Sequence, residues 1–164
     1  MSADWRFEPA GLHDLPAICA LLREAVEWMD ASGQSLWTMD EVAEDVVRPR
    51  LEAGQLRVVR EAERVIASCR VQTSDPDFWP EVDAETSRFL HRLVVARDHA
   101  GQGLTRFMID AAADEARAAG CSHLRLDTAT DRTALRRLYE SLGFVLVDER
   151  QCLRWFVARY ELAL

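Results

Sequence analysis

The chain has 164 residues, of which 49% are hydrophobic and 29% are charged, a composition typical of an ordinary globular domain. Its 28 acidic and 20 basic residues give a formal net charge of −8, which argues against nucleic acid as the main partner and is compatible with a cationic substrate. No apolar run approaches the roughly 20 residues of a membrane helix, and the first residues lack the regions of a signal peptide. We therefore expect one cytoplasmic domain over residues 1–164 and no membrane partner.

The cysteines and histidines show no metal-binding pattern. The four cysteines form no Cys-x-x-Cys pair and do not cluster with any of the four histidines, so the sequence predicts free, mostly buried thiols and no metal site. The cysteines are Cys19, Cys69, Cys121 and Cys152.

The N-terminal half alternates between strand and helix patterns. Apolar residues recur at helical spacing after Pro16, which suits the first turn of a helix that Asp14 can cap. The expected elements are a strand over 5–9, a helix up to about 31, a second helix over 39–51, and a hairpin of strands 55–61 and 64–73.

The C-terminal half follows a loop at 74–80 that is rich in proline and aspartate. Its expected elements are a long strand over 87–95, a helix over 103–119, a strand over 123–128, a helix over 132–142 capped by Asp131, and strands over 144–150 and 153–161. Strand, glycine turn, helix and strand make a βαβ unit, so its two strands should run parallel or splay from parallel. Alternation of this kind favours an α/β or α+β layer fold.

The glycine turn between the long strand and the 103–119 helix is the strongest candidate for a ligand site. Gly101 and Gly103 let the backbone approach a ligand closely, and the free N–H groups and dipole at a helix start favour an anion such as a diphosphate. A tight turn without a ligand is the alternative. The dinucleotide fingerprint does not fit because Arg106 stands in place of its third glycine, and a Walker P-loop is excluded because the chain contains no lysine.

The chain resembles the GNAT family of N-acetyltransferases. The resemblance covers the whole chain in the order of its elements and is specific over residues 90–144. The family signature Gln/Arg-x-x-Gly-x-Gly/Ala aligns with 100–105, where Gly103 matches while Ala100 and Thr105 depart from it.

A second stretch of the chain also resembles the family. The family pattern there is a helix that carries Asn, Ala and Tyr and is followed by Gly-Phe. Here Tyr139 and Gly143-Phe144 match, and Asp131 stands where asparagine is usual. The resemblance implies a single α/β (α+β) domain. Its mixed central sheet of six to seven strands is flanked by about four helices, and strands four and five are splayed.

The resemblance also implies acetyl-CoA as co-substrate and no metal. The pantetheine arm would lie between the splayed strands, and the diphosphate would rest on 101–105. The cofactor-binding residues implied in this way are Leu93, Val94, Val95, Ala100, Gly101, Gln102, Gly103, Leu104, Thr105, Asp131 and Tyr139.

The family reaction is direct attack of an amine on the thioester carbonyl in a ternary complex, which calls for a base, an oxyanion donor and an acid. Tyr139 is the candidate acid or CoA-positioning residue, with a core tyrosine as the alternative. A backbone N–H near Leu93 is the candidate oxyanion donor. The base is Glu85 or His91, which strand alternation places on one face with Leu93. Histidine has the better intrinsic pKa for this work, although a hydrogen-bonded core histidine is the alternative.

Trp37 and Trp79 are the candidate substrate-binding residues, as an aromatic wall for an amine, with ordinary packing as the alternative. The leading hypothesis is an N-acetyltransferase acting on a small amine or a protein N-terminus, as a monomer or homodimer. A non-catalytic acyl-CoA-binding module that senses or regulates, and a nucleotide-binding α/β domain, are the rival hypotheses.

Overall fold

A computed structural model describes residues 4–164. The chain forms two compact units, each made from two segments. Within the described residues, the first unit consists of 4–70 and Arg92–Met108, and the second of Val71–His91 and Ile109–Leu164. The expectation of one domain over 1–164 stays a prediction, and the units are described separately.

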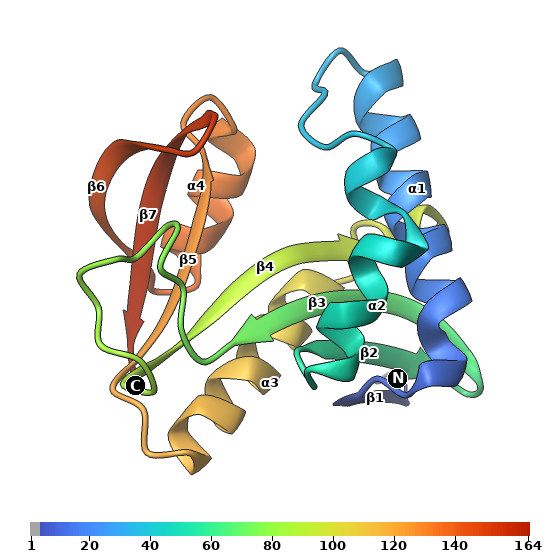
Figure 1. Cartoon of the computed structure of the whole chain (residues 1–164), viewed down its shortest axis with the longest axis horizontal. Coiled ribbons are helices and arrows are strands. Elements are labelled where there is room, and N and C mark those ends of the chain that lie inside the picture. Colours follow the sequence, from blue (N-terminus) through green and yellow to red (C-terminus); the bar gives the residue numbers. More distant parts are fainter. Residues whose placement is uncertain (1–3) are drawn as a thin grey trace. The chain divides into compact units, whose positions relative to one another are not determined.

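The first unit contains two helices that lie side by side and the N-terminal strands (Figure 1). Its elements are β1 (Trp5–Pro9), α1 (Leu15–Ala31), α2 (Glu44–Glu52), β2 (Leu56–Glu61), most of β3 (Arg64–Gln72), the end of β4 (Ser87–Val95) and the start of α3 (Leu104–Ala118). β2 pairs antiparallel with both β1 and β3, which confirms the predicted hairpin.

The helix expected over 39–51 is divided in two. A short 3₁₀ turn over Asp40–Val42 precedes α2, and Ala43 between them has an extended backbone with ψ of 156°. One residue outside the helical region is enough to stop the hydrogen-bond ladder, and the apolar spacing does not reveal it.

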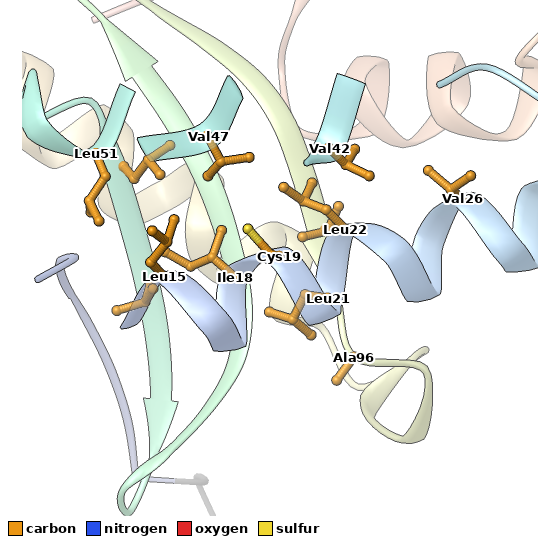
Figure 2. Close-up of a cluster of buried hydrophobic side chains, with 13 residues drawn as sticks. Leu15, Ile18, Cys19, Leu21, Leu22, Val26, Val42, Val47, Leu51 and Ala96 are labelled. Atoms are coloured by element: carbon orange, nitrogen blue, oxygen red, sulfur yellow. The ribbon is translucent and has the colours of Figure 1, made fainter. Parts of the chain in front are cut away.

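The core of the first unit is a layer of aliphatic side chains from α1 and α2 packed on strand residues (Figure 2). Ile18 and Val26 of α1 and Val47 of α2 are at most 2% exposed. They meet Val58 of β2 and Val94 of β4 in one cluster. The 3.6-residue apolar period of α1 is thus satisfied by burial against a sheet face.

Asp14 precedes α1 as expected, but it does not cap the helix with its side chain. Its carboxylate instead accepts a hydrogen bond from the backbone N–H of Gly11 at 2.8 Å and pairs with Arg60 of β2 at 2.7 Å. Arg60 also pairs with Glu8 of β1. Asp14 is 2% exposed, so this pair links α1 to the sheet in a place where an unpaired charge is costly.

The second unit contains the C-terminal strands with α4 beside them (Figure 1). Its elements are β5 (His123–Ala129), α4 (Thr133–Ser141), β6 (Val145–Cys152) and β7 (Trp155–Ala163), with the start of β4 and the end of α3. β5 and β6 both pair antiparallel with β7. The β4 residues Ser87–Leu90 pair parallel with His123–Leu126 of β5, which confirms the predicted βαβ unit.

Trp79 and Arg159 form the center of the second unit, and each is 1% exposed. The guanidinium of Arg159 lies 4.3 Å from the ring centroid of Trp79, and that of Arg125 lies 5.0 Å from the same ring. Arg159 also pairs with Asp148 at 2.7 Å and with Glu81 at 2.6 Å, so its buried charge is fully partnered.

The seven strands follow the hydrogen-bonded order β1-β2-β3-β4-β5-β7-β6. Over residues 4–164, four α-helices accompany a sheet in which β4 pairs parallel with β5, while β2 pairs antiparallel with β1 and β3, and β7 with β5 and β6. This is the mixed α/β architecture that the sequence predicts. Over residues 4–164, no helix combines the length and apolar character that a membrane span needs.

The ion pair of Asp14 and Arg60 supports a stability prediction. Replacing Asp14 with Asn should lower the free energy of unfolding by about 3 kcal/mol, because it leaves the Arg60 charge without its buried partner. Although burial opposes it, the bonds from Arg60 and Gly11 hold the pKa of Asp14 below its usual value. This contribution is therefore present at neutral pH and is lost as the pH falls through that lowered pKa. Urea unfolding measures both effects, with exposed Glu52→Gln as the control that should change little.

Candidate functional site

The glycine turn has the backbone geometry that the sequence predicts. Gly101 and Gly103 have φ of 77° and 91°, in the left-handed region that favours glycine. A Cβ built on either one meets no atom within 4 Å, so both positions border open space. α3 begins directly after them at Leu104, and its described first turn carries Arg106 and no acidic residue. These features suit an anionic ligand at the start of the helix.

A polar cluster anchors the segment that leads into this turn. His99 contacts Asp98 at 2.8 Å through Nδ1 and Glu61 at 3.1 Å through Nε2. Arg64 pairs with Asp98 at 2.8 Å, and Trp5 donates a hydrogen bond to Glu61. The hydrogen bonds to Asp98 and then Glu61 raise the pKa of His99. The turn is therefore tied to the β2–β3 hairpin by charge-assisted contacts.

The strand that leads to the turn is not regular. Arg92, in the middle of β4, has φ of 52°, and side-chain alternation does not continue across such a residue. Val94 is buried in the α1 and α2 cluster, while Leu93 and Val95 are half-buried. The prediction that His91 and Leu93 share one face by simple alternation therefore does not hold.

His91 lies between two carboxylates of the second unit. Its Nε2 is 2.6 Å from Oδ2 of Asp75, in the loop before β4. Its Nδ1 is 3.7 Å from Oδ2 of Asp127, on β5. The side chains of Asp75 and Asp127 are 4% and 9% exposed, so this is a largely desolvated group of titratable residues.

Asp75 is held rigidly. Its Oδ1 accepts a hydrogen bond from the backbone N–H of Phe78 at 3.3 Å, and its carbonyl accepts one from Trp79 at 2.8 Å. Arg159 in turn donates to the carbonyl of Phe78 at 2.9 Å. The carboxylate that meets His91 is therefore fixed by the buried arginine of the unit.

Asp127 has an unusual environment. Its Oδ2 is buried, and no hydrogen-bond partner for it occurs within residues 4–164. Burial raises the pKa of Asp127 to about 6, a rise that the charge of Asp75 reinforces and the charges of His91 and Arg159 oppose. A carboxyl with this pKa can exchange a proton near neutral pH, which is a property of functional sites.

Tyr139 lies on α4 in the second unit and is 7% exposed. Its ring packs 6.0 Å from Phe144 and 6.2 Å from Tyr160. Burial, and to a smaller degree the charge of Asp127, raise the pKa of the hydroxyl. Tyr139 therefore keeps its proton at neutral pH and can act as a donor.

The positions of the other predicted site residues give less support to a role in the site. Glu85 is exposed in a turn before β4, so strand alternation does not place it beside His91. Trp37 is half-buried beneath Arg92, whose guanidinium lies 4.6 Å from its ring centroid. Trp79 is a core residue with little surface for a substrate. Asp131 is exposed and precedes the cap of α4, which is Arg132 rather than Asp131.

Sequence reasoning missed Asp75, Asp127 and His99. Asp75 carries no signal, because aspartates in a proline-rich loop usually serve the turn. Asp127 could have been suspected, since it is an acidic residue within a strand, between Leu126 and Thr128, which are both buried.

Comparisons with known proteins agree with this fold. The model of the acetyltransferase (GNAT) family matches residues 22–144. A Bacillus subtilis (strain 168) protein described as an uncharacterized N-acetyltransferase, YesJ, is 28% identical over 142 residues, which are 83% of this chain and 79% of that protein.

Two solved structures show the same fold. A GNAT family acetyltransferase from Listeria monocytogenes 4b F2365 has a TM-score of 0.83 and 22% identity, with 100% of this chain and 99% of that chain covered. A putative acetyltransferase from Salmonella typhimurium, solved with its cofactor acetyl-CoA, has a TM-score of 0.74 and 22% identity, with 98% of this chain and 94% of that chain covered. At these identities, the likeness concerns the fold alone.

The raised pKa of Asp127 predicts a substitution that stabilises the fold. The folded chain holds this proton more tightly than the unfolded chain, so the associated stability is present below about pH 4 and lost as the pH rises through about 6. Replacing Asp127 with Asn should therefore raise the free energy of unfolding by about 3 kcal/mol at pH 7.5, at about 1.4 kcal/mol per pKa unit, and by little at pH 4. Urea unfolding at both pH values checks this, with exposed Asp77→Asn as the control. A loss of stability at pH 7.5 contradicts it.

Proposed function

We propose that this chain, which belongs to the acetyltransferase (GNAT) family, transfers the acetyl group of acetyl-CoA to a primary amine of a small molecule or of a protein N-terminus. Family membership rests on the match over residues 22–144. The observation that carries the proposal is the turn at Gly101 and Gly103, whose left-handed glycines border open space at the start of α3.

The residues of this turn suit the diphosphate of CoA. Backbone N–H groups of 101–105 would hold it, and Arg106 adds positive charge nearby. Recognition through the backbone explains why Ala100 and Thr105 can replace the usual side chains of the signature. Leu93, Val94, Val95, Gln102 and Leu104, all of the same unit, complete the proposed CoA site. Bound acetyl-CoA supplies the activated acyl group as a thioester.

His91 and Tyr139 are the side chains best suited to the proton transfers. His91 is a candidate base, because an imidazole can accept a proton near neutral pH. Tyr139 is a candidate acid for the departing thiolate, since its raised pKa keeps the hydroxyl protonated. Glu85 is the weaker candidate base, because it is exposed and lies outside β4.

The main rival is a non-catalytic acyl-CoA-binding module, which the departures at Ala100, Thr105 and Asp131 from the family pattern favour. Two measurements separate the enzyme from the binding module. Calorimetry measures CoA binding, and an assay of thiol release from acetyl-CoA with 2-phenylethylamine, putrescine or alaninamide measures turnover. We expect CoA to bind and at least one amine to give thiol release well above the rate without amine. CoA binding with no turnover on any amine would establish the module instead.

Replacing Tyr139 with Phe should lower kcat by about 10²-fold or more, the usual contribution of a positioned acid, while the Kd for CoA changes less than threefold. The chain offers a matched control in Tyr160, its other tyrosine, whose hydroxyl bonds Arg136 and Glu140. Tyr160→Phe removes those bonds and should leave kcat nearly unchanged. Equal activity of Tyr139→Phe and wild type removes Tyr139 from the mechanism.

A further inference from the structure

The contacts of His91 leave one side of its imidazole without a hydrogen-bond donor. With Nε2 at 2.6 Å from Asp75, the natural assignment places the ring proton there, donated to the carboxylate. Nδ1 then presents a lone pair toward Oδ2 of Asp127, 3.7 Å away. When Asp127 is ionised, both facing atoms are acceptors, and a single donor group between them would satisfy both.

The protein supplies no such donor within residues 4–164, where Oδ2 of Asp127 has no hydrogen-bond partner. Five groups surround it electrostatically: His91 of β4, Asp75 of the loop, Arg159 of β7, Tyr139 of α4 and Cys152 of β6. Arg159 is the strongest cation among them, but its guanidinium is already bonded to Asp148, Glu81 and the carbonyl of Phe78. A buried carboxylate oxygen in this state favours a ligand that brings its own N–H groups.

A metal ion fits less well, although the three side chains place their ligand atoms within 4.8 Å of one another. Asp75 is already engaged with Nε2, which faces away from Nδ1 on the same ring. This leaves Nδ1 and Asp127 as two ligands, fewer than the three protein ligands of a typical catalytic zinc site.

An ammonium group matches these two acceptors in charge and in hydrogen bonding. It carries three or fewer N–H donors on one nitrogen, and that nitrogen can lie about 2.9 Å from both acceptors. One N–H then points at Asp127, where its charge is neutralised, and another points at Nδ1, which can take the proton.

We propose that Asp127 and Nδ1 of His91 together bind the ammonium of the acyl acceptor, with His91 as the base and Asp75 as a positioning residue that fixes the tautomer of His91. This inference rests on the proposed acetyl transfer and names the side chains that select its acceptor. Asp127 is then a substrate-binding residue that the sequence did not indicate.

The proton transfers balance. The ammonium N–H bond breaks and its proton moves to Nδ1, which then donates to Asp127, while Asp75 stabilises the imidazolium from the other side. The freed nitrogen lone pair forms the C–N bond to the thioester carbon, and the C–S bond breaks. The nitrogen loses two protons in all. The proton on His91 is released to solvent, and the second replaces the proton that the departing thiolate takes up.

This arrangement makes charge the basis of acceptor selection. A primary ammonium satisfies both acceptors, whereas an alcohol of the same shape has a single donor and leaves the buried carboxylate unneutralised. 2-Phenylethylamine and 2-phenylethanol form a matched pair of probes that differ only in this group. We expect thiol release with the amine and none above background with the alcohol.

The variants separate binding from proton transfer. Asp127→Asn should raise the KM for 2-phenylethylamine at least tenfold while the Kd for CoA changes less than twofold. Asp75→Asn should lower kcat/KM at least tenfold and move the acidic limb of its pH profile to lower pH, because an amide neither fixes one tautomer nor stabilises the imidazolium. His91→Gln should lower kcat by 10²-fold or more, with partial recovery at a pH where the amine is already deprotonated.

Asp77→Asn is the matched control, since Asp77 is exposed in the same loop as Asp75. It should leave KM, kcat and the pH profile as in wild type. A merely structural role for Asp75 would lower the amount of folded enzyme but would not move the pH profile. An unshifted profile in Asp75→Asn therefore overturns its positioning role.

Calorimetric titration of 2-phenylethylamine into the CoA-bound protein separates failure of this inference from failure of acetyl transfer. Tighter binding to wild type than to Asp127→Asn supports the ammonium site whether or not turnover occurs. Equal affinity for both proteins, or equal turnover of amine and alcohol, overturns it. Activity that a chelator abolishes and added zinc restores would assign the cluster to a metal instead.

Discussion

The buried charge of Arg159 is the constraint around which the second unit is organised. A guanidinium that is 1% exposed must be fully partnered, and Asp148, Glu81 and the carbonyl of Phe78 supply those partners while Trp79 stacks against it. The bond to Phe78 fixes the loop that carries Asp75. One internal ion network thus sets the position of a residue at the candidate site.

The same network leaves Oδ2 of Asp127 without a hydrogen-bond donor among residues 4–164, because the nearest strong cation, Arg159, is already engaged. A buried carboxylate oxygen without a hydrogen-bond donor lowers the free energy of unfolding. This oxygen lies where Nδ1 of His91 also presents a lone pair. Stability is commonly given up at sites that must meet a ligand. The unpartnered oxygen of Asp127 is thus a structural observation on which the proposed acceptor binding is built.

The glycine turn of the first unit works by a different principle. Its left-handed glycines and helix start offer backbone N–H groups rather than side chains, so the anion binding that we propose for it is compatible with Ala100 and Thr105. The cluster of His99, Asp98 and Glu61 holds the entry to the turn by side-chain contacts instead. Backbone recognition therefore tolerates sequence change, while the anchoring of the turn depends on specific charged residues.

The sequence by itself determined the order of elements, the glycine turn and the family, because apolar periodicity and the glycine requirement at positive φ are local properties. It also identified His91 and Tyr139 as candidates for proton transfer. Only the tertiary structure decided which groups surround His91, since Asp75 and Asp127 come from separate segments of the chain. Their approach follows from the pairing register of β4 with β5 and from the contacts that fix the loop before β4, neither of which a single sequence encodes in any local pattern.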